Sequence, residues 1–190
     1  MRRWLAVGAV LAGGVVGLPS TAEADVPRGG TIVEGQGIAG AKLGDTLAAV
    51  RAVYGLEGSC APDLATRQGF TDACRWSVTG SAVEFGRPTE YVKVRFGTIP
   101  AGTNRRGKVV YRVGAREIDT NSPGFATTKG IAVGASFTTL GLAYDPALRD
   151  CGTPVCLPGG ASNGVGGLTK FWFSKYTTLI VSDLNRISVE

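Results

Sequence analysis

The side chains that could carry out chemistry in this chain are four cysteines and a small set of carboxylates. The 190 residues include no histidine, which removes the general base that Ser-His-Asp and Cys-His sites require. The cysteines fall as Cys60 and Cys74, then Cys151 and Cys156. Zinc sites favour C-x-x-C spacing and often include histidine. We therefore expect no metal site and no cofactor.

The N-terminus predicts export. Residues 1–24 join a basic start, MRR, to an apolar run and an A-x-A cleavage pattern at Ala22-Glu23-Ala24, which together are typical of a signal peptide. The apolar run is too short and too rich in glycine to favour a membrane-spanning helix. We predict cleavage before Asp25, no transmembrane segment afterwards, and a secreted protein in the extracellular space or on the exterior of the cell envelope.

An even number of cysteines in an exported chain favours disulfides over reactive thiols. Oxidised cysteines cannot act as thiolate nucleophiles. Four cysteines permit three connectivities, and the internal duplication described below suggests pairing within each copy, Cys60 with Cys74 and Cys151 with Cys156.

Carboxylates could still serve a hydrolase, because pairs of them catalyse glycoside hydrolysis. The acidic residues in the strand-rich stretch are Asp72, Glu84 and Glu90, whose simpler interpretation is a soluble surface. The glycines at 159–167 lack the lysine and the following helix of a phosphate-binding loop. We predict that the protein is not an enzyme, with a carboxylate-dependent hydrolase as an alternative.

Binding residues are suggested by the segment EYVKVRFG, 90–97, where the apolar side chains alternate with Tyr91, Lys93 and Arg95. Mixed basic and aromatic side chains, here joined by Arg112 on a neighbouring strand, are typical of nucleic-acid binding. The exported compartment argues against that partner, so we expect no nucleic acid. Tryptophan and arginine are common at the centres of protein interfaces. The partner-binding residues that we predict are Trp76, Tyr91, Arg95 and Trp172.

These residues must be positioned by a pattern that occurs twice. AKLGDTLAAVRAVYG (41–55) and IAVGASFTTLGLAYD (131–145) each predict a strand end, a glycine turn and a short helix. Asp45 or Thr46 in the first copy and Ser136 in the second can cap the helix. The apolar faces expected to match are Leu47, Val50 and Tyr54 in one copy and Phe137, Leu140 and Tyr144 in the other.

Strand-like segments follow each predicted helix, and LPGGASNGVGG (157–167) predicts a mobile loop. We therefore predict an α+β fold of two tandem repeats. Each would be a short helix packed on an antiparallel meander, and the two could form one curved sheet. The predicted boundaries are a signal peptide at 1–24, a linker at 25–35, repeat 1 at 36–122 and repeat 2 at 123–190.

The two corners, with GSC…ACRW and KVRFG after the first, resemble the β-lactamase-inhibitor-protein-like fold. Its broader relatives include the small lipoprotein of the outer-membrane β-barrel assembly machinery. The resemblance implies secreted tandem repeats, each with a disulfide shortly after its helix, that present a concave sheet to another protein. It also implies an enzyme-inserting hairpin tip, which by position would fall within Thr79–Tyr91. Inhibition of a β-lactamase is one function that it suggests.

Together these observations predict a secreted, non-enzymatic binding module. It would bind an extracellular or envelope macromolecule through the open face of its sheet, in the manner of an inhibitor. The net charge of +5 suggests an alternative, because a basic surface attracts anionic neighbours. In that alternative the protein is a structural component of the envelope that binds anionic wall polymers.

Overall fold

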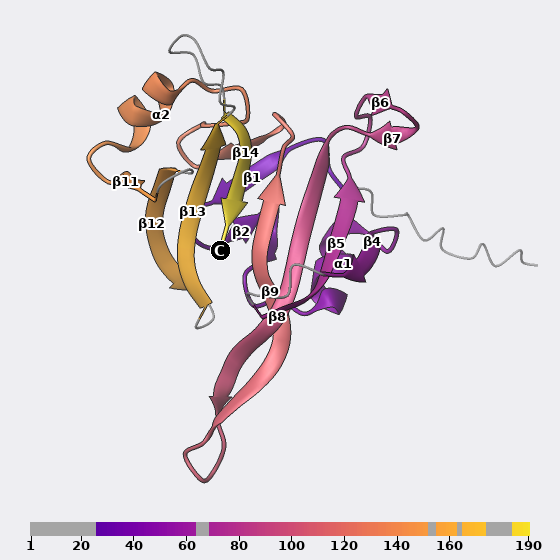
Figure 1. Ribbon diagram of the computed structural model, residues 1–190, viewed down its shortest axis with the longest axis vertical. Coiled ribbons are helices and arrows are strands. Elements are labelled where there is room, and N and C mark those ends of the chain that lie inside the picture. Colours follow the sequence, from indigo (N-terminus) through magenta and orange to yellow (C-terminus); the bar gives the residue numbers. More distant parts are fainter. Residues whose placement is uncertain (1–25, 64–68, 152–154, 163–164, 174–183) are drawn as a thin grey trace, which may run out of the picture.

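Figure 1 shows the computed structural model, which describes residues 26–63, 69–151, 155–162, 165–173 and 184–190. The protein is mostly β and is built on one antiparallel sheet of eight strands. In spatial order these are β11 (Arg149–Asp150), β12 (Val155–Ser162), β13 (Val165–Phe173), β14 (Leu184–Val189), β9 (Val109–Thr120), β8 (Tyr91–Thr103), β5 (Phe70–Ser77) and β4 (Ser59–Pro62). The predicted signal peptide lies outside the described residues.

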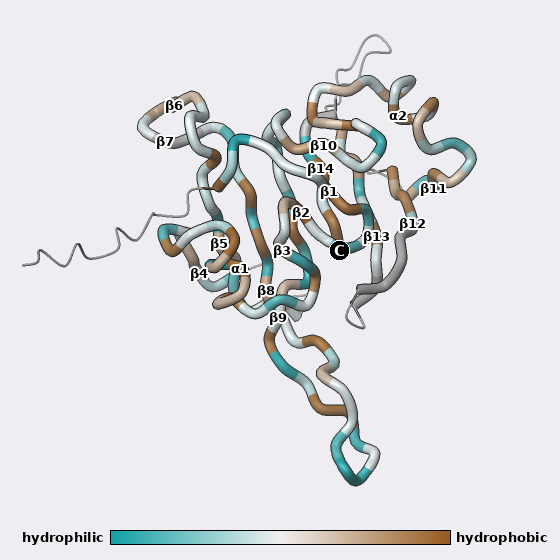
Figure 2. Tube along the Cα trace, turned by 180° about the vertical axis from the view of Figure 1, so that it is seen from behind, coloured by the Kyte–Doolittle hydropathy of each residue, from teal (hydrophilic) through white to brown (hydrophobic). Residues whose placement is uncertain are grey.

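A second sheet of four strands packs behind the first in the view of Figure 1 and in front of it in Figure 2. Its strands are β10 (Phe125–Thr127), β1 (Gly30–Val33), β2 (Gly37–Ile38) and β3 (Ala41–Lys42). β1 and β10, which are far apart in the chain, pair in parallel. Apolar side chains of this sheet, including Ile32, Ile38 and Phe125, are fully buried in the core.

The two predicted helices are present, and each has eight residues: α1 (Leu47–Tyr54) and α2 (Phe137–Tyr144). The side chain of Thr46 accepts a hydrogen bond from the Ala49 amide, and Ser136 caps α2 in the same way. Such caps satisfy an amide at the N-terminus of a helix that would otherwise lack a partner. Neither described helix is long and apolar enough to span a bilayer.

The core lies between the eight-stranded sheet and the elements behind it. One row of paired residues crosses the sheet on this side: Trp76, Val92, Thr120, Ile187 and Phe171. Tyr54 of α1 packs on Trp76 at one end of this row, and Tyr144 of α2 packs on Phe171 at the other, with ring centroids 5.6 and 5.8 Å apart. Both helices therefore cover the same face.

The predicted fold class, an α+β fold of two helix-plus-meander repeats, is wrong. Strands from both halves of the chain are merged in the eight-stranded sheet and again in the four-stranded one. β1 comes from the region predicted as a linker and β10 from the region predicted as repeat 2, yet they are neighbours. The alternation of side chains in a strand indicates which face is buried, but it does not determine which other strand lies beside it. The prediction of two separate repeats is wrong for this reason.

The glycine-rich segment 157–167 also differs from the prediction. Its described residues belong to β12 and β13, which pair from Leu157–Thr169 to Gly159–Gly167, and they do not form the predicted mobile loop. The disulfide prediction is confirmed, since Cys60 bonds to Cys74 and Cys151 to Cys156. The first bond ties β4 to β5, and the second ties the chain after β11 to β12.

A small hairpin of β6 (Val83–Glu84) and β7 (Arg87–Pro88) projects from the connection between β5 and β8. Glu84 pairs with Arg87, so the turn consists of Phe85 and Gly86, which have φ angles of 49° and 75°. Two positive φ angles in a two-residue turn define type I′, which favours asparagine and glycine. Phe85 is nevertheless present there, and its side chain is fully exposed.

Candidate binding surface on the open sheet face

The open face is the side of the eight-stranded sheet opposite both helices and the four-stranded sheet. On β8, Val92, Val94 and Phe96 are buried toward the helices. Because side chains alternate along a strand, Tyr91, Lys93 and Arg95 lie on the open face. The same alternation places five further side chains there: Arg75 on β5, Asp119 on β9, Arg186 on β14, and Lys170 and Trp172 on β13.

Four of these side chains stack as an alternation of arginines and aromatic rings, which we call the stacked ladder: Arg75, Tyr91, Arg186 and Trp172. The Arg75 guanidinium carbon lies 4.2 Å from the centre of the Tyr91 ring, and that of Arg186 lies 4.3 Å from Trp172. Arg186 also lies close enough to Tyr91 for its charge to lower the pKa of the Tyr91 hydroxyl, and the two side chains line the same recess, which links the two stacks. Cation–π contacts of this kind place the guanidinium group over the face of the ring.

Trp172 is fixed further by its indole nitrogen, which donates to the Ser188 hydroxyl at 3.2 Å. A recess of about 360 Å³ opens beside the ladder, lined by Tyr91, Asn121, Trp172, Phe173 and Arg186. Burial raises the pKa of the Tyr91 hydroxyl, the nearby Asp119 charge raises it further, and Arg186 opposes this change. Tyr91 therefore stays neutral and offers a ring and a hydroxyl to a ligand.

Acidic groups form the floor of this face. Arg95 contacts Glu117 at 2.8 Å and Asp63 at 3.2 Å. Burial is the largest influence on Arg95 and disfavours its charged form, but Glu117, Asp63 and Asp119 together outweigh it and raise the pKa of the guanidinium. Asp119 is only 1% exposed, and its Oδ1 has no hydrogen-bond partner among the described residues.

The pKa of Asp119 is raised to about 6. Burial is the largest cause, and the charge of Glu117 adds to it. The positive charges of Arg186, Lys93 and Arg95 act in the opposite direction. Asp119 is thus a nearly enclosed carboxyl that cationic side chains surround, and the ladder and its neighbours cover it.

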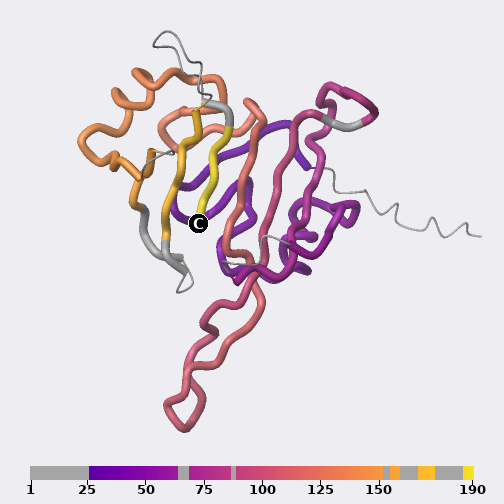
Figure 3. The backbone as a smooth tube through the Cα atoms, in the orientation of Figure 1, coloured from indigo at the N-terminus to yellow at the C-terminus, as the bar shows by residue number. Residues whose placement is uncertain are grey.

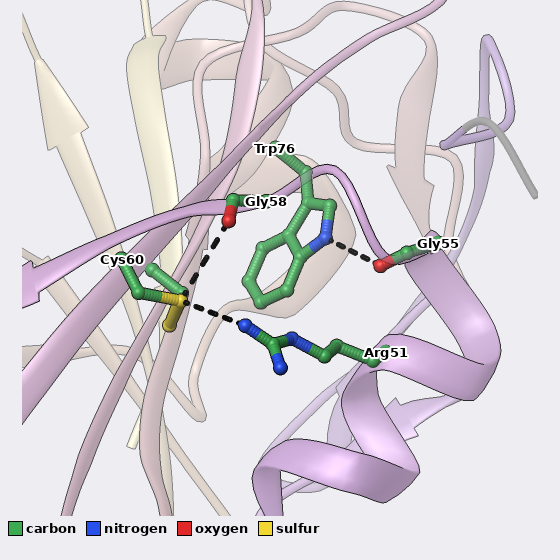
Figure 4. The surroundings of a disulfide bond; sticks show 6 residues. Arg51, Gly55, Gly58, Cys60 and Trp76 are labelled. Carbon is green, nitrogen blue, oxygen red and sulfur yellow. Dashed lines mark hydrogen bonds between the residues drawn. A yellow bond between two sulfur atoms is a disulfide. The ribbon is translucent and has the colours of Figure 1, made fainter.

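Three of the four predicted binding residues lie on this open face: Tyr91, Arg95 and Trp172. Trp76 does not. It is 3% exposed and lies beside the C-terminal end of α1, where its indole nitrogen donates to the Gly55 carbonyl at 2.9 Å (Figure 4). The prediction that Trp76 anchors a partner is therefore wrong.

The physical reason is strand parity. Trp76 shares its face of β5 with Cys74, which is buried in the core. Its counterpart near the other helix is Phe171, so the adjacent Trp172 points to the opposite side of the sheet. Counting alternate residues from a buried neighbour would have separated the two tryptophans.

The ladder also includes Arg75 and Arg186, which were not predicted. A signal for Arg186 was available, because Ile187 and Val189 in the last strand face inward and leave Arg186 on the other side. Arg112, which was predicted beside Lys93 and Arg95, instead pairs with Ile99 farther along the β8–β9 hairpin. Its distance from the ladder follows from strand register, which the sequence does not specify.

The carboxylates considered for hydrolysis do not converge. Asp72 pairs with Phe96 in the sheet, whereas Glu90 precedes Tyr91 at the start of the same strand, β8. Six residues of extended strand separate positions 90 and 96 by roughly 20 Å, more than twice the spacing that glycosidases use. Glu84 lies exposed on the β6–β7 hairpin, within the segment Thr79–Tyr91 that the resemblance pointed to.

Comparisons with known proteins do not assign a family. No protein-family model matches the chain, and no curated protein matches it. One solved structure that it resembles is the crystal structure of the uncharacterized protein yfeY from Escherichia coli. The two are 14% identical, the alignment covers 87% of this chain and 99% of that one, and the TM-score is 0.40. The resemblance to the β-lactamase-inhibitor-protein-like fold therefore stays a prediction.

Proposed function

We propose that this protein is an exported, non-enzymatic binding module that holds a macromolecular partner against the open face of its eight-stranded sheet. The observation that carries the proposal is the stacked ladder of Arg75, Tyr91, Arg186 and Trp172. The two disulfides indicate a compartment outside the cytoplasm. The partner would then be an extracellular or envelope macromolecule.

The ladder has the chemistry of an interface centre. Tyrosine, tryptophan and arginine are the side chains most enriched at protein-interface hot spots, and stacking holds them in place before a partner arrives. Preorganised side chains lose less conformational entropy on binding. The ion pairs of Arg95 with Glu117 and of Lys170 with Glu190 lie on the same side of the sheet and suit a polar rim.

The hydrolase alternative finds less support in the geometry. The carboxyl group with the raised pKa, Asp119, is 1% exposed and lies beneath cationic side chains, so a substrate could not reach it without moving them. The alternative of a structural envelope protein predicts binding to purified cell wall that salt weakens strongly, because screening weakens contacts between exposed charges. The ladder proposal predicts a weaker dependence on salt.

A photo-crosslinking side chain placed at Ser77 tests the proposal in the native host. Ser77 is exposed on the open face and pairs with Tyr91. A matched control places the same crosslinker at Leu142, which is 86% exposed on α2 on the other side of the protein. We expect one discrete adduct from position 77 and none of the same mass from position 142. Adducts from position 142 alone would contradict the proposal.

The partner from that adduct then allows a quantitative test. Trp172→Ala and Arg75→Ala should each weaken binding by about 2 kcal/mol or more. Leu142→Ala should leave binding unchanged. Equal binding by all three variants, at an unchanged Tm, would show that the ladder does not hold the partner.

A further inference from the structure

The β8–β9 hairpin extends well beyond the rest of the sheet (Figure 3). We call its outer part, Thr98–Val113, the distal arm. Every residue from Pro100 to Val113 is exposed. The turn at its end is ordered by Asn104, whose side-chain oxygen accepts hydrogen bonds from the amides of Arg106 and Lys108. The arm is therefore a defined β-ribbon that projects into solvent.

One face of this ribbon is apolar. Val109, Tyr111 and Val113 are alternate residues of β9, so they share a face, and they are 49%, 62% and 50% exposed. Their cross-strand partners on β8 are the uncharged residues Thr103, Pro100 and Thr98. Figure 2 shows apolar stretches of the arm next to its hydrophilic end. Most apolar side chains of this sheet are buried in the core, and an exposed apolar row of this kind is typical of an interaction surface.

The arm is also uniformly cationic. It contains Arg105, Arg106, Lys108 and Arg112 and no acidic residue. Among the described residues, none of these four side chains forms an ion pair. The positive charge at the end of the arm is thus available to an anionic surface.

We propose that the distal arm docks this protein on an anionic lipid bilayer. Peripheral binding to such bilayers combines apolar side chains that enter the boundary between headgroups and acyl chains with basic side chains that attract the anionic lipids. The Val109–Tyr111–Val113 row supplies the first part and the basic tip supplies the second. Tyrosine is among the residues enriched at that depth of a membrane.

Two other occupants fit the arm less well. A soluble anionic polymer would use the cations but would leave the apolar row in water. A second copy added along the β8 edge of the ribbon would meet the gap in backbone donors at Pro100. A second copy of the arm at either edge would also bring like charges together, because each arm carries four cations and no acidic residue. The bilayer is the occupant that uses both features.

Co-sedimentation with lipid vesicles tests the proposal on the exported protein. Wild type should bind vesicles of phosphatidylcholine mixed with phosphatidylglycerol and should not bind phosphatidylcholine alone. R105Q/R106Q should weaken binding about tenfold or more. The matched control R28Q/K42Q removes two exposed charges elsewhere and should bind like wild type. All variants share one N-terminus, so differences between them report on the arm.

The apolar row has its own test. V109S/Y111S/V113S keeps the net charge but should also lose binding, with an unchanged Tm because these side chains lie outside the core. Tyr111→Trp adds a tryptophan to the row. On vesicles that contain brominated lipids, a larger part of its fluorescence should be quenched than in wild type.

Four results would overturn the proposal. The first is that both arm variants bind vesicles as tightly as wild type, and the second is that the R28Q/K42Q control loses as much binding as R105Q/R106Q. The third is that wild type does not bind vesicles, while wild type and V109S/Y111S/V113S bind inorganic polyphosphate equally. The fourth is a dimer in light scattering that forms only when the arm is unmutated. None of these results bears on the open-face proposal, which uses different residues.

Discussion

The burial of Asp119 should make the free energy of unfolding depend on pH. Its pKa is about 6 in the folded protein, against about 4 in an unfolded chain. The folded state therefore holds this proton more tightly than the unfolded state. The contribution of Asp119 to stability is fully present below about pH 4 and is lost as pH rises through about 6.

Asp119→Asn should remove this dependence. The free energy of unfolding of wild type minus that of the variant should fall by about 1–3 kcal/mol between about pH 4 and about pH 7. Urea unfolding of both proteins across this range measures the difference and cancels the groups that they share. A difference that stays constant with pH would show that Asp119 titrates normally.

Phe85 holds a backbone conformation that its side chain disfavours. Its φ of 49° lies in the left-handed region, which costs most residues about 1 kcal/mol but is tolerated by asparagine. Phe85→Asn should therefore raise the free energy of unfolding by up to about 1 kcal/mol. Val83→Asn is the matched control, because Val83 is 64% exposed on the same hairpin but lies in strand β6. A gain in both variants would point to surface polarity and not to backbone strain.

The helices α1 and α2 share length and capping but differ in how much apolar surface they bury. Val50 and Tyr54 are buried on α1, and Leu140 and Tyr144 are buried on α2. At the first position of each, Leu47 is partly buried while Phe137 is 52% exposed. Of the three pairs of positions predicted to match, two are therefore equally buried, Val50 with Leu140 and Tyr54 with Tyr144.

A pair of truncations should reveal this packing. Val50→Ala should lower the free energy of unfolding by about 1–3 kcal/mol, because the side chain is fully buried against the core. Leu142→Ala, on the outer side of α2, should change it by less than about 0.5 kcal/mol. Chemical denaturation measures both. Equal small effects would mean that α1 contributes little to the core.

Individual helices and strands were easier to predict from this sequence than the pairing of the strands. The glycine turns before both helices, the capping residues Thr46 and Ser136, and the inward and outward positions of β8 all follow from local patterns. The neighbours of β1 and β14 do not, because pairing depends on which strands meet in space and not on local alternation. For the same reason only part of the ladder was predicted. The sequence indicates which residues of a strand share a face, but strand register decides that Arg75 and Arg186 lie next to Tyr91 and Trp172.

At the scale of the whole molecule, one buried cluster contains side chains from both halves of the chain, from Val26 to Val189. A shared core and a continuous sheet couple the halves, so neither should unfold alone. We expect a single cooperative transition whose midpoint is lowered by Val50→Ala in the first half and by Leu140→Ala in the second. Calorimetry and circular dichroism measure it. Two separate transitions, each sensitive to one variant, would show independent units.

The position of β14 has a consequence for biosynthesis. β14 lies between β9 and β13, in the middle of the eight-stranded sheet, although it follows all the other described strands in sequence (Figure 3). A ribosome or an export channel releases the chain from its N-terminus onward, so β9 emerges long before the strand that must cover its edge. Until residues 184–189 arrive, that edge is an open template for any passing strand. The period between the emergence of β9 and the release of the last strand is therefore when this protein most needs a chaperone.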